Sequence, residues 1–305
     1  MELETQTEES KETIIKHIII SGGAQTGLAF YGVLKESEKQ KFWNIENIQT
    51  IYATSVGSMV AIMLCLKYDW DTLDSYLIKR PWQNIFKIDL YTIIRAFDQR
   101  GIFSIQLIEE IFSPLFLGKD IPISVTMKEF YDLTGIELHI FTTELNKFET
   151  IDLSHKTHPD WKILDAIYCS STLPIVFSPI IKDDSTCYID GGFLLDFPLF
   201  KCLQCVDNED EIFSIRKHNK KKNTVIDNTS SFFDFLMTII NNLLKRILND
   251  TNKYSIKNEI AVIDQAVSIQ DIISTAFSIE ERQRLIQHGV DIFIEFSEKR
   301  NKQKE

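Results

Sequence analysis

Apolar and polar positions follow two patterns in the first part of the chain. Ile14–Ile20 is a β-branched run that ends at a pair of glycines, and Ile48–Tyr52 is a second, shorter run of the same kind. Each run is followed by a stretch with apolar residues at helical spacing, Leu28–Phe42 and Ser58–Tyr68. A strand, a tight loop and a helix that repeat in this order predict a mostly parallel sheet with helices on its faces.

The rest of the chain extends this α/β pattern without an internal repeat or a long linker. Residues 71–116 follow a helical pattern with breaks near 80 and 100. Further expected strands are 136–143, 149–153, 186–189 and 212–215; further expected helices are 161–169, 232–248 and 280–299; and residues 217–228 are expected to form a basic loop. We therefore expect one domain, with a disordered acidic tail over 1–13, a core over 14–205 and a C-terminal part of the same domain over 206–305.

Charge and composition exclude several classes of protein. The chain of 305 residues has a formal net charge of −11, which argues against the basic surface that nucleic-acid binding requires. No apolar run approaches the roughly 20 residues of a membrane-spanning helix, and no apolar segment typical of a secretory signal follows Met1. The five cysteines, an odd number, fit reduced thiols and a cytoplasmic location. Cys202 and Cys205 form a lone CxxC without a second pair, so we expect no metal site.

A serine stands between the second expected strand and the helix after it, in the segment Ala53-Thr54-Ser55-Val56-Gly57. Small residues two positions before and two positions after a serine are typical of a nucleophile elbow, a turn so tight that larger side chains would collide. Such a turn lifts the Ser55 hydroxyl above the sheet and directs the next amide at a developing oxyanion. Taken alone, the same serine could equally cap the following helix.

A loop of small residues, Gly22 to Gly27, follows the first expected strand. It admits two interpretations: a relaxed dinucleotide loop that binds a pyrophosphate at the start of a helix, or a set of backbone amides that bind an oxyanion. A dinucleotide site requires an acidic residue where the next strand closes, to bind the ribose. That strand closes with Tyr52 and Ala53 and has no acid there. The pattern therefore favours acyl transfer, with nucleotide binding as an alternative.

A third motif, Asp190-Gly191-Gly192, follows a short expected strand. By itself, Asp-Gly-Gly is a common turn. A serine nucleophile needs a base, however, and among the histidines only His155 and His158, which flank a loop, are plausible. A carboxylate serves as a base when it is partly desolvated and hydrogen-bonded to the serine, so Asp190 is the preferred candidate.

These three motifs, in this order, resemble the patatin-like phospholipases, a family of serine acyl hydrolases that use a Ser–Asp dyad. Two further blocks add to the resemblance. Residues 100–103 are similar to the family's loop before its mid-domain helix, and residues 165–179 to its Ser/Pro segment. The resemblance extends from about Ile14 to Leu199. It implies a three-layer α/β/α fold with a mostly parallel central sheet.

Carried over position by position, the resemblance makes Ser55 the nucleophile and Asp190 the general base. The amides of Gly22, Gly23 and Ala24 would form the oxyanion hole. The elbow and the supporting motifs would comprise Ala53, Val56, Gly57, Gly27, Gly191 and Gly192. The implied reaction is hydrolysis of a lipid carboxylic ester through an acyl-enzyme, of the phospholipase A or lysophospholipase type, without a cofactor or a metal.

Three positions depart from the family pattern. Ala24 stands where a third glycine is usual, Thr26 where an arginine or lysine is usual, and Asp196 where an asparagine is usual. Ala24 would narrow the approach to the hole, and Asp196 would raise the pKa of Asp190 if the two lay close together. Thr26→Arg is expected to keep the fold and to raise turnover modestly. A catalytically weakened relative that binds lipid is therefore a second alternative.

The substrate implied by the resemblance is a phospholipid or another acyl-ester lipid, met peripherally at a membrane surface. Phe232–Leu248 has a broad apolar face, and Lys217, Lys220, Lys221 and Lys222 precede it. A helix of this kind more often packs on a core than on a bilayer, and such a loop is more often simply solvated. The sequence indicates no oligomeric state.

Overall fold

The structure, a computed structural model, describes residues 13–219, 226–228, 230, 232–247, 254–264 and 269–302. Nearly all of the expected acidic tail lies outside the described residues, as do Lys220, Lys221, Lys222 and Leu248. The strands are β1 His17–Ile20, β2 Thr50–Thr54, β3 Gly101–Phe103, β4 Glu137–Glu144, β5 Glu149–Leu153, β6 Ile175–Phe177, β7 Ile180–Lys182, β8 Thr186–Asp190, β9 Ile212–Asn219 and β10 Glu259–Asp264. The α-helices are α1 Gly27–Lys39, α2 Val56–Cys65, α3 Trp70–Lys79, α4 Leu90–Gln99, α5 Ile105–Leu117, α6 Met127–Thr134, α7 Ile163–Ser171, α8 Leu199–Leu203, α9 Phe232–Ile247, α10 Ile269–Phe277 and α11 Ile279–Lys302.

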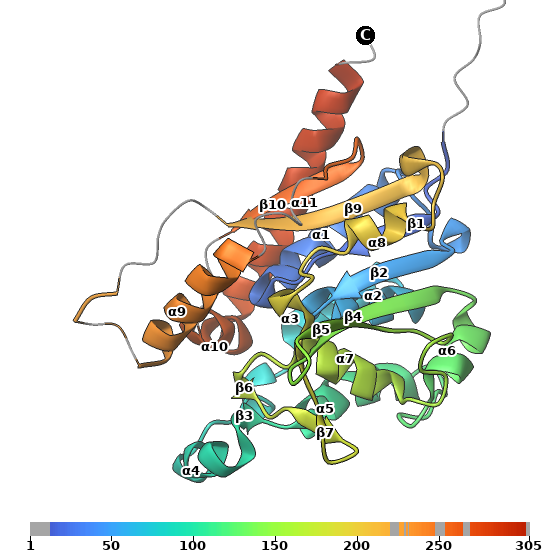
Figure 1. Cartoon of the computed structure of the whole chain (residues 1–305). Coiled ribbons are helices and arrows are strands. Elements are labelled where there is room, and N and C mark those ends of the chain that lie inside the picture. The colour runs from blue at the N-terminus through green and yellow to red at the C-terminus, as the bar shows by residue number, and fades with distance from the viewer. Residues whose placement is uncertain are drawn as a thin grey trace, which may run out of the picture.

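The central sheet joins its strands in the order β10-β9-β1-β2-β4-β8-β7, with β5 paired to β4 (Figure 1). β10, β9, β1, β2 and β4 run parallel, whereas β5, β7 and β8 are antiparallel to their neighbours. In this register, Ile20 at the end of β1 lies between Ala53 of β2 and Ile215 of β9. The loops that follow the parallel strands therefore gather at one edge of the sheet, where ligands bind in open α/β sheets.

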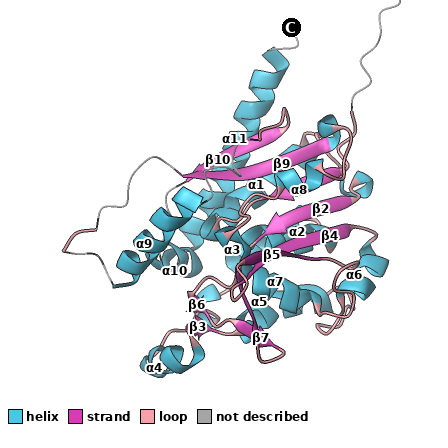
Figure 2. Ribbon diagram, viewed as in Figure 1, coloured by secondary structure: helices cyan, strands magenta, loops and turns pink. Residues whose placement is uncertain are grey.

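Side chains of successive strand residues pack on opposite faces of the sheet, and helices cover them (Figure 2). Ile18 and Ile20 belong to the larger buried cluster, together with residues of α1, α2, α5 and α7. Ile19 lies in a smaller cluster with Tyr52 and with residues of α8. Burial on both faces explains why the first strand is a continuous apolar run and not an alternating one. The expected three-layer arrangement around a mostly parallel sheet is confirmed.

The C-terminal helix α11 packs along α1, and glycines on both helices bring the two backbones together. A Cβ added at Gly289 would meet the backbone carbonyl of Ala29, and one added at Gly32 would meet that of Ile286. β10 extends the sheet beyond β9 in the same way that α11 extends the helical layer. Residues after 205 thus contribute both to the central sheet and to the helical layer that covers it.

The structure departs from the sequence expectation mainly near the C-terminal part. β9 runs to Asn219 instead of ending at Ile215, because β10 pairs with it from Ser214 onward and satisfies its backbone groups. β10, α6 and α10 were not expected. The expected breaks are confirmed, since α3 ends at Lys79 and α4 at Gln99. Within the described ranges, no helix is long and apolar enough to cross a membrane.

Gly289→Ala is expected to destabilise the protein, although alanine is ordinarily the better helix former by about 1 kcal/mol. The added methyl would meet the Ala29 carbonyl and push α11 away from α1. We expect the free energy of unfolding, measured by urea denaturation, to fall by about 1–3 kcal/mol. Gln287→Ala, at an exposed position of the same helix, is the control and should change it by less than about 0.5 kcal/mol. An unchanged Gly289→Ala protein would contradict the close helix contact.

Candidate active site

Ser55 forms the junction between β2, which ends at Thr54, and α2, which begins at Val56. Its backbone has φ 54° and ψ −128°, a conformation that residues other than glycine rarely adopt. The turn is tight enough that a Cβ at Gly57 would lie 2.6 Å from the carbonyl oxygens of Ile20 and Ser21. The sharp strand-to-helix turn that the sequence predicted is therefore present. Ser55 occupies the helix N-cap, but its side chain makes no capping hydrogen bond.

The Ser55 hydroxyl instead donates a hydrogen bond to Oδ2 of Asp190 at 2.6 Å. The register of the sheet explains why two residues so far apart in sequence meet. Thr54 lies opposite Phe141 of β4, and Asp190 lies opposite the next residue, Thr142. The other carboxylate oxygen, Oδ1, accepts from the backbone N–H of Gly192 at 2.7 Å. Ser55 and Asp190 are both buried, at 9% and 7% exposure.

Burial raises the pKa of Asp190 to about 7, because removal from water disfavours the charged carboxylate. Hydrogen bonds from Ser55 and Gly192 lower this pKa, and the nearby charge of Asp196 raises it. The sequence-based expectation about Asp196 is confirmed in direction, although burial is the larger cause. A carboxylate with a pKa near 7 has the proton affinity that suits a general base at neutral pH.

The two histidines kept as alternatives lie in other contacts. His155 stacks on Tyr131 with ring centroids 3.8 Å apart, and His158 meets Trp161 edge to face at 5.0 Å. Neither has a hydrogen bond to Ser55 in the part of the chain that the structure describes. The geometry therefore favours the carboxylate partner over a histidine.

The glycine loop lies directly against the elbow. A Cβ at Gly22 would come within 3.4 Å of Cβ of Ser55, and one at Gly27 would collide with the side chain of Val56. The N–H of Gly22 donates to the backbone carbonyl of Asp196 at 3.0 Å. Gly22 therefore belongs to the wall of the site, and its amide is already engaged.

The amides that follow, those of Gly23 and Ala24, are the better candidates for an oxyanion hole, together with that of Val56 at the start of α2. None of these three amides donates a backbone hydrogen bond to another of the described residues. Ala24 has φ 48°, in the left-handed region that favours glycine. The family's usual glycine at this position therefore has a conformational reason, and Ala24 adopts the same backbone at a cost.

The burial of position 26 disfavours a cation there. Thr26 ends the short helical turn of the glycine loop, Ala24–Thr26, and is fully buried, at 0% exposure. An arginine there would have to bury its guanidinium, so Thr26→Arg is expected to disturb the fold, contrary to the expectation from the family pattern. The structure instead brings a cation to the loop from β9. Nζ of Lys217, a residue that the sequence assigned to a solvated loop, is 3.5 Å from the carbonyl oxygen of Gly23.

Two serines hold the strained elbow in place. The N–H of Ser55 donates to Oγ of Ser170 at 2.8 Å, and that hydroxyl donates to the carbonyl of Phe141 at 2.6 Å. The hydroxyl of Ser58 donates to the carbonyl of Ser55 at 2.6 Å. Ser170 lies in the segment 165–179 that resembles the family's Ser/Pro segment, whereas no sequence pattern indicated Ser58.

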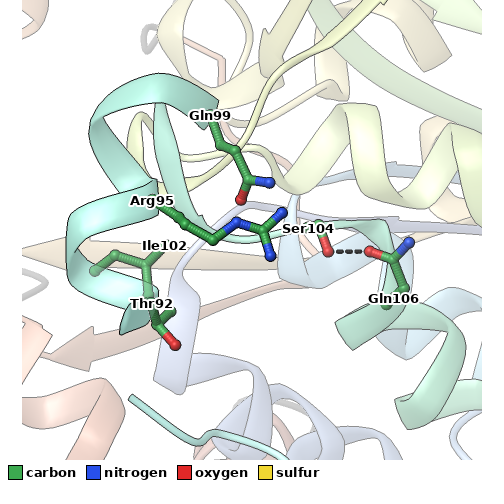
Figure 3. Close-up of a pocket in the computed structure, with 6 residues that line it drawn as sticks. All are labelled: Thr92, Arg95, Gln99, Ile102, Ser104 and Gln106. Atoms are coloured by element: carbon green, nitrogen blue, oxygen red, sulfur yellow. Dashed lines mark hydrogen bonds between the residues drawn. The ribbon is translucent and has the colours of Figure 1, made fainter. Parts of the chain in front are cut away.

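A separate cavity of about 410 Å³ lies between α4 and the start of α5 (Figure 3). Figure 3 shows Arg95 and Gln99 of α4 on one side and Ser104 and Gln106 on the other. Thr92 and Ile102 complete the lining. The lining is mostly polar and contains neither Ser55 nor Asp190.

Comparison with known proteins finds similar viral proteins. The chain is 27% identical over 249 residues to a probable lipid hydrolase of Invertebrate iridescent virus 6, covering 79% of this chain and 80% of that protein. It is 24% identical over 278 residues to an uncharacterized protein of Acanthamoeba polyphaga mimivirus, covering 90% of each.

Among solved structures, VipD from Legionella pneumophila matches with a TM-score of 0.51 at 16% identity, covering 92% of this chain and 66% of that one. This likeness concerns the fold alone, and the chain spans only about two-thirds of VipD. A family model described as patatin-like phospholipase matches residues 18–202. Because the match covers more than half of the chain, the protein belongs to the patatin-like phospholipase family.

Proposed function

We propose that the protein hydrolyses carboxylic esters of lipids, as a phospholipase A or lysophospholipase, with Ser55 as nucleophile and Asp190 as general base. The family assignment supports lipid as the substrate class and disfavours nucleotide binding. The single observation that carries the finer proposal is the hydrogen bond of 2.6 Å from the Ser55 hydroxyl to the buried carboxylate of Asp190. Nucleophile and base within hydrogen-bond reach are the geometric signature of this chemistry.

In the proposed reaction, Asp190 takes the proton of Ser55 while Oγ attacks the ester carbonyl. The amides of Gly23, Ala24 and Val56 stabilise the negative charge that develops on the carbonyl oxygen. The tetrahedral intermediate collapses, and the alcohol leaves with the proton that Asp190 held. Water then attacks the acyl-enzyme by the same route, with Asp190 again as base, and releases the fatty acid.

Ser55→Ala and Asp190→Asn are each expected to reduce ester hydrolysis by several orders of magnitude, and the double variant should lose little more. The effects are not additive because either change disables the same step. The measurement is release of fatty acid from phospholipid vesicles. A fluorophosphonate should label Ser55 and no other serine.

His155→Ala and His158→Ala are the control variants for this experiment and should retain activity. Full hydrolysis by Asp190→Asn, with a histidine variant inactive, would replace the dyad by a Ser–His pair. Vesicle binding by the parent protein without any release of fatty acid would instead indicate the catalytically weakened, lipid-binding relative.

The rate of hydrolysis is expected to fall as the pH drops through about 7, because Asp190 must be ionised to act as base and its pKa is raised to about 7. The stability of the fold depends on the ionisation of Asp190 in the opposite direction and falls as the pH rises. A carboxyl whose pKa is higher in the folded than in the unfolded state destabilises the fold as the pH rises between the two values. Asp190→Asn should therefore raise the melting temperature at pH 8 while abolishing activity. A midpoint near pH 4 for the acid limb would contradict the buried base.

An exposed apolar stripe on α9 supports contact with a phospholipid bilayer as part of the proposed function. Phe232, Phe235, Ile239 and Leu243 follow one face of the helix and are each between 42% and 76% exposed. Figure 1 shows α9 on the side of the molecule toward which the parallel strands point, and Ser55 directly follows the end of one of them, β2. A bilayer is the apolar partner that suits an exposed amphipathic helix on that side of a lipid-hydrolysing protein.

Phe232→Ser combined with Leu243→Ser is expected to lower binding to phosphatidylcholine vesicles by at least about tenfold, measured by co-sedimentation, because burial of each side chain in the bilayer contributes up to about 1.5–3 kcal/mol. Hydrolysis of a soluble short-chain ester should be unchanged. Leu133→Ser, which removes an exposed leucine from α6 on the opposite side, is the control. Equal vesicle binding by all three proteins would show that α9 does not meet the bilayer.

A further inference from the structure

Strand β9 brings a charged residue to the wall of the glycine loop. β9 runs parallel to β1 with Ile215 opposite Ile20, and it continues past the end of β1. Ser21 N donates to Ile215 O at 3.0 Å, and Lys217 N donates to the Ser21 hydroxyl at 2.9 Å. The backbone of Lys217 is therefore held beside the residues that open the loop.

The side chain of Lys217 lies along Gly23. Its Nζ is 3.5 Å from the carbonyl oxygen of Gly23, and its Cδ is 3.2 Å from the position that a Cβ would take there. The same carbonyl accepts from Thr26 N at 3.1 Å. Because the peptide is planar and trans, a carbonyl fixed on one side sets the direction of the Ala24 N–H on the other. Lys217 thus orients one of the amides that are candidates for the oxyanion hole.

Asp196 brings negative charge to the same wall. Its backbone carbonyl accepts from Gly22 N at 3.0 Å, and its Oδ1 lies 3.1 Å from the position of a Cβ on Gly192, the residue that donates to Asp190. The carboxylate of Asp196 therefore lies close to both the loop and the proposed base. Its charge opposes ionisation of Asp190.

Burial raises the pKa of Asp196, and the two cations that face it from β9, Lys217 and Arg216, each oppose that rise. Arg216 is shared with another carboxylate, since its Nη1 is 4.0 Å from Glu259 of β10, which also lies 3.9 Å from Nε2 of His218. Arg216 also lies over the ring of Phe197. Lys217 contacts the glycine loop at Gly23.

We propose that Lys217 is a positioning residue for the reaction, one that takes the place of the cation missing at position 26. It holds the glycine loop through the Gly23 carbonyl and offsets the charge of Asp196 beside the base. This inference rests on the proposed function of Ser55 and Asp190. The family pattern alone does not provide it, because Lys217 lies outside the matched residues 18–202.

The test is the pH profile of Lys217→Gln. We expect kcat for ester hydrolysis to fall about tenfold to hundredfold, as for the loss of part of an oxyanion hole. The midpoint of the acid limb should move to higher pH by about half a unit to one unit, because a positive charge near the two carboxylates is lost. Lys217→Arg keeps the charge, so its kcat and its acid-limb midpoint should both lie close to those of the parent protein. Lys128→Gln removes an exposed lysine charge from α6 and should change neither.

An Asp196→Asn background separates the electrostatic role from a packing role. There Lys217→Gln should still move the midpoint to higher pH, because the lost positive charge acts on Asp190 whether or not residue 196 carries a charge. An unchanged midpoint in that background would overturn the proposal. So would a lower kcat with an unchanged midpoint, which would show that Lys217 only stabilises the loop.

A second measurement does not depend on catalysis. Carboxyl ¹³C NMR of aspartate-labelled protein follows the titration of Asp190, with Asp190→Asn identifying its signal. If the protein fails to hydrolyse lipid esters but the Asp190 titration moves in Lys217→Gln, the proposed function fails and the electrostatic role of Lys217 stands. If the protein is active and the titration does not move, the role of Lys217 fails alone.

Discussion

The site depends on one costly arrangement, a carboxylate buried beside a serine in a strained turn. Burial disfavours the charge of Asp190, and the left-handed backbone of Ser55 disfavours the turn. Both are held by local hydrogen bonds: Gly192 donates to the carboxylate, Ser170 accepts from the Ser55 N–H, and Ser58 donates to the Ser55 carbonyl. The rigid sheet beneath the turn supplies the remaining constraint, so the strain is retained where the chemistry needs it.

The sheet register explains how this arrangement is assembled from distant parts of the chain. β4 is the shared template, because its consecutive residues Phe141 and Thr142 pair with the ends of β2 and β8. Ser55 follows the last residue of β2, and Asp190 is the last residue of β8, so the two lie side by side at the same edge of the sheet. The glycine loop reaches the same place from the end of β1. A parallel sheet with an antiparallel strand beside it therefore brings Ser55, Asp190 and the glycine loop together without a long connecting loop.

Much of the fold and of the candidate site could be predicted from the sequence, because each part of the site has a local turn motif that can be recognised. A serine between small residues, a glycine loop and an Asp-Gly-Gly turn each follow an apolar strand and need no distant contact to be recognised. Residues whose function depends on pairing between strands could not be found in that way. Lys217 and Asn219 look like part of a solvated basic loop until β10 pairs with β9. The burial of Thr26 could not be predicted from the sequence either, because it depends on how the loop packs in the fold.

The C-terminal part of the chain has more than a packing role in this view of the site. The family match ends at residue 202, yet the loop that follows β1 is bounded on one side by β9, which begins at Ile212. Two glycines press α11 onto α1, the helix that the loop leads into, and β10 completes the pairing of β9. Lys217 belongs to a strand that is paired on both sides, so its backbone is held more rigidly than that of a loop residue. Charge near the glycine loop is therefore tied to the integrity of the whole sheet, and in the proposed reaction a change far from Ser55 that loosens β9 would act on the site through Lys217.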